Sequence, residues 1–116
     1  MSSDVSSSAS PFTTKATPED LTHLLISHQT FEGSWDVSSD ILQALQTQDA
    51  VIKAECAKAG VGEKEFITAL VIAVFEKILK EFEGSWELVV EKARGWLADQ
   101  VQDVDALVGK AGELVK

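Results

Sequence analysis

The sequence predicts an all-α fold, a compact bundle of five or six helices around a buried central helix at about residues 63–82. Apolar residues recur at helical spacing along most of the chain after Ala16, and the run at 63–82 is apolar nearly all round in its middle. No strand signal accompanies them, because the sequence has no Asn-Gly or Asp-Gly turn and no run that alternates apolar and polar residues. A chain of 116 residues is long enough for one domain with its own core.

The N-terminal segment stands apart from this pattern. Residues 1–16 are rich in Ser and Thr and show no apolar period. Such a segment cannot bury enough apolar surface to offset the entropy that ordering costs. We therefore expect a disordered tail at residues 1–16 and a helical domain at residues 17–116.

The first helix begins at a capping signal. Thr17 is a good N-cap, Pro18 suits the first helical position, and two acids follow at the positive end of the helix. We expect this helix to run to about Gln29, before Gly33 breaks the chain. Its apolar face is formed by Leu21, Leu24, Leu25 and His28.

Two shorter helices are expected next. The candidate caps of the second helix are Asp36, Ser38 and Ser39, and its apolar stripe is Ile41, Leu42 and Leu45. Asp49 begins a third, weaker helix, which Gly60 and Gly62 end.

The segment at about 63–82 is the predicted central helix, because a helix that is apolar nearly all round must be enclosed by others. A buried strand is the alternative, since Val71 and Ile72 favour sheets. Strong helix formers continue the pattern as far as Lys80, and this length decides for a helix. We expect the centre of the core to be formed by Leu70, Val71, Val74, Phe75 and Ile78.

The last third of the chain predicts one long helix or two. Gly84 and Ser85 mark a break, and Ser85 is the expected cap of the fifth helix. The apolar positions then repeat every seven residues as far as Leu114, so either the fifth helix runs on or a sixth begins at Asp103. Gly109 and Gly112 would each cost about 1 kcal/mol inside a helix, so we expect the last turn or two to fray.

The charge of the chain bears on its partners. The net charge is −9, from 19 acidic and 10 basic residues. Such a surface repels phosphate backbones and anionic lipids, and no basic patch with interleaved aromatics occurs. No apolar stretch approaches the roughly 20 residues that cross a bilayer. We expect no nucleic-acid binding and no membrane association, whereas a basic protein partner is compatible.

Cysteine usage and the N-terminal pattern bear on the location. Cys56 is the only cysteine, so no intramolecular disulfide can form, and we expect a structural thiol. The N-terminal segment lacks the basic and apolar regions of a secretory signal. By elimination we expect the cytosol or the nucleus, and we take the cytoplasm as the location.

Residues suited to catalysis are few. The only histidines, His23 and His28, lie five apart on one predicted helix, about 140° apart around its axis, so they cannot share a metal ion. The sequence shows no nucleophile elbow, no phosphate-binding Gly-rich loop and no cluster of metal ligands. We therefore expect no enzymatic activity, no metal and no cofactor.

One pentapeptide, Phe-Glu-Gly-Ser-Trp, occurs twice, at residues 31–35 and 82–86. One interpretation is structural: the Gly turns the chain, the Ser caps the next helix, and the Trp anchors a corner. The other is that the two tryptophans form a recognition surface. The candidate binding residues are the aromatic side chains of both copies and one further tryptophan: Phe31, Trp35, Phe82, Trp86 and Trp96.

The three tryptophans are expected to differ in exposure. Gln29 and Trp35 flank a Gly turn as in the QW motif of toroidal terpene-cyclase-like proteins, a stabilising clamp, so Trp35 should be buried with the Gln29 amide holding it. A toroid needs many such repeats, which excludes that fold. Trp86 lies in line with an apolar helix face and should be mostly buried, which leaves Trp96 as the best candidate for partial exposure.

Three segments, at residues 25–35, 67–76 and 86–97, resemble in the same order the C-terminal region of proteins that join a VIT domain to a von Willebrand factor type A domain. The similarity covers about residues 21–98. Neither the VIT nor the von Willebrand domain is present, so the chain would be a stand-alone copy, and Gly84 and Ser85 stand where the family usually has charged residues. The resemblance implies an accessory helical interaction domain. Because the related region of vault poly(ADP-ribose) polymerase binds the major vault protein, it also implies a vault-like or other large assembly as partner.

These observations favour a non-catalytic protein-interaction domain of the adaptor or scaffold type. The alternative is a carrier of a small apolar ligand, bound between the helices around the central one. The apolar stripe at residues 90–114 also leaves room for a homodimer formed through the C-terminal helix.

Overall fold

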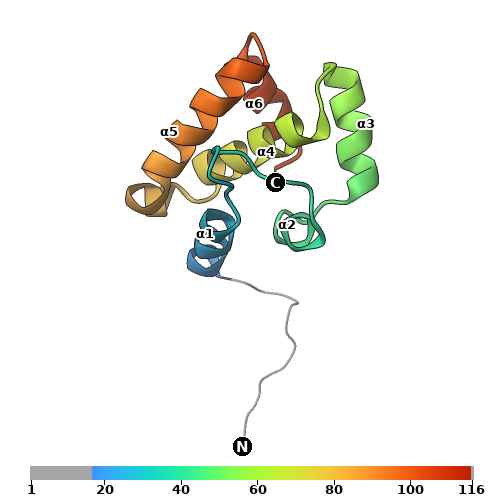
Figure 1. Ribbon diagram of the computed structural model, residues 1–116. Coiled ribbons are helices and arrows are strands. Elements are labelled where there is room, and N and C mark those ends of the chain that lie inside the picture. Colours follow the sequence, from blue (N-terminus) through green and yellow to red (C-terminus); the bar gives the residue numbers. More distant parts are fainter. Residues whose placement is uncertain (1–16, 116) are drawn as a thin grey trace, which may run out of the picture.

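The computed structural model describes residues 17–115, which contain six α-helices, one short 3₁₀ helix and no strand (Figure 1). The all-α prediction is therefore confirmed, whereas the expected tail at residues 1–16 lies outside the described residues. The elements in chain order are α1 (Pro18–Ser27), α2 (Ser39–Ala44), α3 (Asp49–Ala59), α4 (Glu63–Lys77), the 3₁₀ helix η2 (Lys80–Phe82), α5 (Glu83–Gln100) and α6 (Val104–Gly112).

Helix α4 lies in the middle of the fold, with α5 and α6 on one side of it and α3 on the other (Figure 1). Ten successive residues of α4, from Phe66 to Phe75, are buried, so the helix presents no face to solvent over nearly three turns. This burial confirms the predicted central helix. Leu70, Val71, Val74 and Phe75 belong to the core as expected.

The C-terminal end of α4 differs from the prediction. The helix ends at Lys77 rather than near Phe82, and Ile78, expected in the core, is 44% exposed. The chain turns at Leu79, whose side chain is fully buried and whose carbonyl oxygen accepts hydrogen bonds from the Phe82 amide and the Trp86 indole. A continued helix would commit this carbonyl to the amide four residues ahead. The helix instead gives way to a 3₁₀ turn, in which the Leu79 carbonyl also accepts the Trp86 indole.

The first three helices follow their capping signals. The Thr17 hydroxyl accepts a hydrogen bond from the Asp20 amide (3.1 Å), and Pro18 occupies the first turn of α1. Of the three candidate caps of α2, Ser38 is the one used, with its hydroxyl 3.3 Å from the Ile41 amide nitrogen. Helix α3 ends at Gly60 in the left-handed conformation (φ +73°).

The start of α5 also corrects a prediction. The helix begins at Glu83, so Gly84 and Ser85 lie exposed in its first turn, and Ser85 is not its N-cap. The 3₁₀ turn before it already brings the chain into helical backbone, with φ −51° and ψ −40° at Glu83. No glycine turn is needed at that point, and Gly84 simply continues the helix.

Helix α6 is a separate element, which resolves the alternative left open by the seven-residue repeat. Asp103 is its N-cap, and its carboxylate accepts a hydrogen bond from the Ala106 amide at 3.0 Å. The helix includes Gly109 and ends at the buried Gly112, so Glu113 to Val115 lie beyond it. A Cβ atom at Gly112 would lie 3.5 Å from the Cβ of Ala73, which is an ordinary van der Waals distance, so α4 and α6 pack closely here.

The apolar stripe that suggested a dimer is used within the chain. Its main members are buried within the single chain, whereas Val104 and Leu114 are partly buried. These buried residues are Val90, Ala93, Leu97, Leu107 and Ala111.

Candidate functional site

The tryptophans of the two pentapeptides both contact one phenylalanine in the core. Trp35 is fully buried and Trp86 is 5% exposed. The Phe75 ring of α4 lies 6.2 Å from the Trp35 ring at an angle of 56°, and 5.4 Å from the Trp86 ring in a stacked arrangement at 24°. Both spacings are those of favourable aromatic pairs. Neither indole is therefore available on the surface.

Both indole N–H groups bind carbonyl groups near the end of a preceding helix. Trp35 donates to the Leu25 carbonyl of α1 (2.7 Å), and Trp86 donates to the Leu79 carbonyl that follows α4 (2.6 Å). Each carbonyl also accepts a backbone amide, from His28 at Leu25 and from Phe82 at Leu79, so the indole N–H supplies a second hydrogen bond to an oxygen with two lone pairs and is itself satisfied in the core. The geometry supports the structural interpretation of both tryptophans.

Gln29 has a different role from the expected clamp on Trp35. Its side-chain amide nitrogen lies 3.1 Å from the Gly33 carbonyl oxygen and 3.1 Å from the Val89 carbonyl oxygen of α5. The Trp35 backbone amide binds the Thr68 hydroxyl instead (3.1 Å). Gln29 therefore fastens the loop at residues 29–34 to α5, sixty residues away in sequence. That separation is why sequence reasoning could not identify its partner.

Gly33 brings the same loop into close contact with α5. Its φ is +109°, a conformation that residues with a side chain rarely adopt. A Cβ atom at this position would lie 2.9 Å from the Lys92 carbonyl oxygen and 3.0 Å from its Cγ atom. Gly33 is thus required both for the turn and for the close approach.

This fastened loop carries Phe31, which is 88% exposed. Leu88, on the adjoining stretch of α5, is 75% exposed, and these two are the most exposed large apolar side chains among residues 17–115. Leu88 lies one residue before Val89, which Gln29 binds, and one helical turn before Lys92, on which Gly33 packs. The loop segment that carries Phe31 and the stretch of α5 that carries Leu88 therefore lie side by side.

Trp96 continues this region along α5. Leu88, Lys92 and Trp96 are spaced i, i+4 and i+8, so they share one helix face. Trp96 is half-buried, which confirms its expected partial exposure, and the Lys64 ammonium lies 5.6 Å from its ring centroid. Lys64 also lies 3.2 Å from the Glu32 carboxylate of the loop. We call this region the loop–α5 surface and define it by Phe31, Glu32, Lys64, Leu88, Lys92 and Trp96.

The candidate residues named from the sequence thus divide into two groups. Phe31 and Trp96 belong to the loop–α5 surface, whereas Trp35 and Trp86 are core residues. Phe82 is partly buried and packs against the core at the start of α5. Leu88 was missed, although one signal was present: it is a large apolar residue that lies off the apolar stripe of its own helix.

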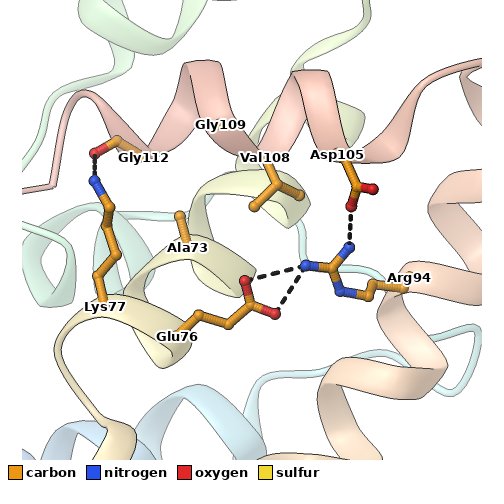
Figure 2. Close-up of a pocket in the computed structure, with 8 residues that line it drawn as sticks. All are labelled: Ala73, Glu76, Lys77, Arg94, Asp105, Val108, Gly109 and Gly112. Carbon is orange, nitrogen blue, oxygen red and sulfur yellow. Dashed lines mark hydrogen bonds and ion pairs between the residues drawn. The ribbon is translucent and has the colours of Figure 1, made fainter.

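A cavity of about 320 Å³ opens between α4, α5 and α6 (Figure 2). Figure 2 shows the Arg94 guanidinium between two acids, 2.8 and 3.0 Å from the Glu76 carboxylate oxygens and 2.9 Å from the Asp105 carboxylate. Lys77 donates to the Gly112 carbonyl at 3.1 Å. The cavity is lined by Ala73, Glu76, Lys77, Arg94, Asp105, Val108, Gly109 and Gly112.

Most of the charged groups that line this cavity form hydrogen bonds or ion pairs with one another. Partial burial lowers the pKa of Arg94, but the hydrogen bonds and negative charges of Glu76 and Asp105 outweigh it and raise that pKa above its usual range. Arg94 therefore stays charged and links α4, α5 and α6. Four charged side chains around so small a cavity suit a structural ion-pair network better than an apolar ligand.

The residues that could take part in catalysis or metal binding, the two histidines and Cys56, lie apart from one another. Both histidines are exposed, including His28, which was expected on the apolar face; its Nε2 lies 3.9 Å from the Asp40 carboxylate. Cys56 is buried, with its sulfur 3.2 Å from the Lys53 carbonyl oxygen. Over residues 17–115, no group of three or more His, Cys, Asp or Glu is placed to hold a metal ion. In the same part of the chain, no helix has the length and apolarity that crossing a bilayer requires.

No protein-family model, curated protein or solved structure matches this chain.

Proposed function

We propose that this chain is a non-catalytic protein-interaction domain of the adaptor type, and that the loop–α5 surface is its binding site. The observation that carries the proposal is the exposure of Phe31 and Leu88 on segments held in place by Gln29 and Gly33. A large apolar side chain that is exposed on a fixed backbone loses little conformational freedom on binding, which is the property of an anchor residue.

The composition of the surface supports this proposal. Aromatic residues are enriched at the centres of protein interfaces, and here Phe31 and Trp96 belong to the same surface as the aliphatic Leu88. The charged groups at the margin, Glu32 and Lys64, resemble the polar rim of an interface. By contrast, the cavity bounded by α4, α5 and α6 is lined by charged groups that bind one another, which favours an interaction domain over a carrier of an apolar ligand.

The resemblance to the C-terminal region of VIT and von Willebrand factor type A proteins is part of the same proposal. The three segments that carry it meet in the core, since the Trp35 amide binds Thr68 and the rings of Trp35 and Trp86 both contact Phe75. On this basis we propose a cytoplasmic domain that docks on a larger assembly, for which the vault particle is the first partner to examine.

A comparative pull-down tests the proposal. The wild-type chain, the double variant Phe31→Ser/Leu88→Ser and the control Val51→Ser, which alters an exposed apolar residue of α3, are used as baits in an extract of the source cell. We expect a protein set that binds the wild type and the control and is lost from the double variant. Retention of every partner by the double variant would place binding elsewhere. Extra mass in a native mass spectrum that disappears on denaturation would instead favour the ligand carrier.

A further inference from the structure

The exposed face of α5 carries a row of acids beside Leu88. Glu83, Glu87 and Glu91 are spaced i, i+4 and i+8, so their carboxylates lie one above the other along the helix. All three are exposed, and among residues 17–115 none of them forms an ion pair. Like charges at i and i+4 repel each other. No ion pair among the described residues offsets this repulsion within the row.

The other acids near the loop–α5 surface differ in this respect. Glu32 and Asp36 both lie near Lys64, at 3.2 and 3.9 Å, so the loop acids are compensated within the chain. The row on α5 has no such partner among the described residues, although Leu88 lies next to Glu87 in sequence and one helical turn before Glu91. An exposed apolar anchor thus stands beside a line of uncompensated negative charge, on a chain of net charge −9.

From this juxtaposition we infer that the partner of the loop–α5 surface is a cationic amphipathic helix. Its apolar side chains cover Phe31 and Leu88, and its lysines or arginines lie against Glu83, Glu87 and Glu91. The acidic row is about 12 Å long, which equals the spacing of cations at i, i+4 and i+8 on a partner helix that lies along α5. Complementary charge would set the orientation and speed of binding, while the apolar contacts would supply most of the affinity.

A second copy of this chain fits the surface less well. A symmetric dimer through the loop–α5 surface would bring two uncompensated acidic rows towards one interface, and like charges placed together oppose association. The inference rests on the proposed function, since it names the partner of the same surface. Its test therefore separates a wrong partner class from a wrong surface.

The test uses two synthetic helical peptides of about 15 residues with the same leucine face. One carries lysine at i, i+4 and i+8, and the other carries glutamate at those positions. Binding to the full chain is measured by fluorescence anisotropy at about 0.05 M and 0.5 M salt. We expect the lysine peptide to bind at least about tenfold more tightly than the glutamate peptide, and to weaken at high salt.

Variants of the chain locate the binding. Phe31→Ser/Leu88→Ser and Glu87→Gln/Glu91→Gln should each weaken the lysine peptide by about tenfold. The matched controls Val51→Ser and Glu19→Gln/Glu113→Gln, which change an exposed apolar residue and two exposed acids elsewhere, should leave it unchanged. Circular dichroism and thermal melts establish that every variant is folded as the wild type is.

Three other outcomes of these binding experiments would contradict the inference. If the glutamate peptide binds as tightly and is lost in Phe31→Ser/Leu88→Ser, the surface is a binding site but its partner is not cationic. If neither double variant weakens the lysine peptide more than its control does, both the surface and the partner class are wrong. If sedimentation shows that the chain self-associates and that Phe31→Ser/Leu88→Ser abolishes this, the occupant is a second copy.

Discussion

The two copies of Phe-Glu-Gly-Ser-Trp have the same residues but different structures. The first, at residues 31–35, is a loop whose glycine has φ +109° and whose serine is buried. The second, at residues 82–86, begins a helix, with both glycine and serine exposed in its first turn. What they share is the tryptophan, which in both copies is buried, contacts Phe75 and binds a carbonyl group near the end of a preceding helix.

The comparison shows which part of a short repeat determines structure. The backbone conformation of each copy is set by its flanks, by Gln29 and the contact with Lys92 in the first and by the 3₁₀ helix in the second. Burial of the indole is common to both because it depends on the core and not on the turn. A consequence is that only the first copy presents its phenylalanine to solvent.

The largest loss of stability is expected at Phe75, which the tryptophans of both copies contact. Phe75→Ala removes the ring that both indoles contact and leaves a cavity, so it should lower the free energy of unfolding by about 3–5 kcal/mol. Trp35→Ala and Trp86→Ala should each cost a similar amount. Urea denaturation measures these losses, with the exposed Leu88→Ala as a control that should stay within about 0.5 kcal/mol of wild type. A near-neutral Trp86→Ala would show that only the first copy anchors the core.

The glycines should respond with opposite signs. Gly33→Ala places a side chain at φ +109° and close to the Lys92 carbonyl, so we expect a loss of about 1–3 kcal/mol. Gly84→Ala has no neighbouring atom within 4 Å and lies in a helix, so we expect a gain of about 0.5–1 kcal/mol. Thermal melts of the two variants provide the comparison. The same sign for both would contradict the different conformations described above.

Gln29 has no counterpart in the second copy, and its removal tests the fastening of the loop. Gln29→Ala deletes hydrogen bonds to two carbonyl groups, and we expect a loss of about 1–2 kcal/mol. Amide exchange should become faster in residues 30–34 and remain unchanged in α4, because the loop opens locally. Unchanged exchange in the loop would mean that Gly33 and its neighbours hold it without Gln29.

The smallest effect concerns the serines. Ser34 is buried and its hydroxyl lies 3.0 Å from that of Thr30, so Ser34→Ala should cost about 1 kcal/mol. Ser85 is exposed and does not cap its helix, so Ser85→Ala should change stability by less than about 0.5 kcal/mol. Chemical denaturation of the pair resolves the difference. A loss at Ser85 equal to that at Ser34 would restore the capping role that the sequence predicts.

Features set by neighbouring residues were predicted well from the sequence. The cap at Thr17 and the stop at Gly60 depend on the geometry of a few adjacent residues, and the structure has them where expected. Ser38 is one of three caps that the sequence offers, and Asp103 begins one of the two alternatives it leaves open. The burial of α4 followed from its apolar composition. These signals are local, or depend on one segment alone, so no knowledge of the fold was needed to use them.

Features set by distant contacts were missed. The end of α4 is accompanied by a bond from Trp86 to Leu79, which the helical propensities of the residues after Lys77 do not reveal. The place of Gln29 depends on Val89, and the exposure of Leu88 depends on which face of α5 the core covers. The binding surface joins a loop to a helix far away in sequence, so only its individual members, Phe31 and Trp96, were named beforehand.

The enclosure of α4 also bears on how the domain folds and opens. A helix buried on every side cannot lose its contacts one face at a time, so its amides should exchange with solvent only when the whole domain unfolds. It also has little reason to be stable before α5 and α6 surround it, which ties the formation of the C-terminal helices to that of the core. A chain shortened before α6 would expose the apolar surface of α4 that α6 covers, and its failure would be seen as aggregation rather than as a smaller stable domain.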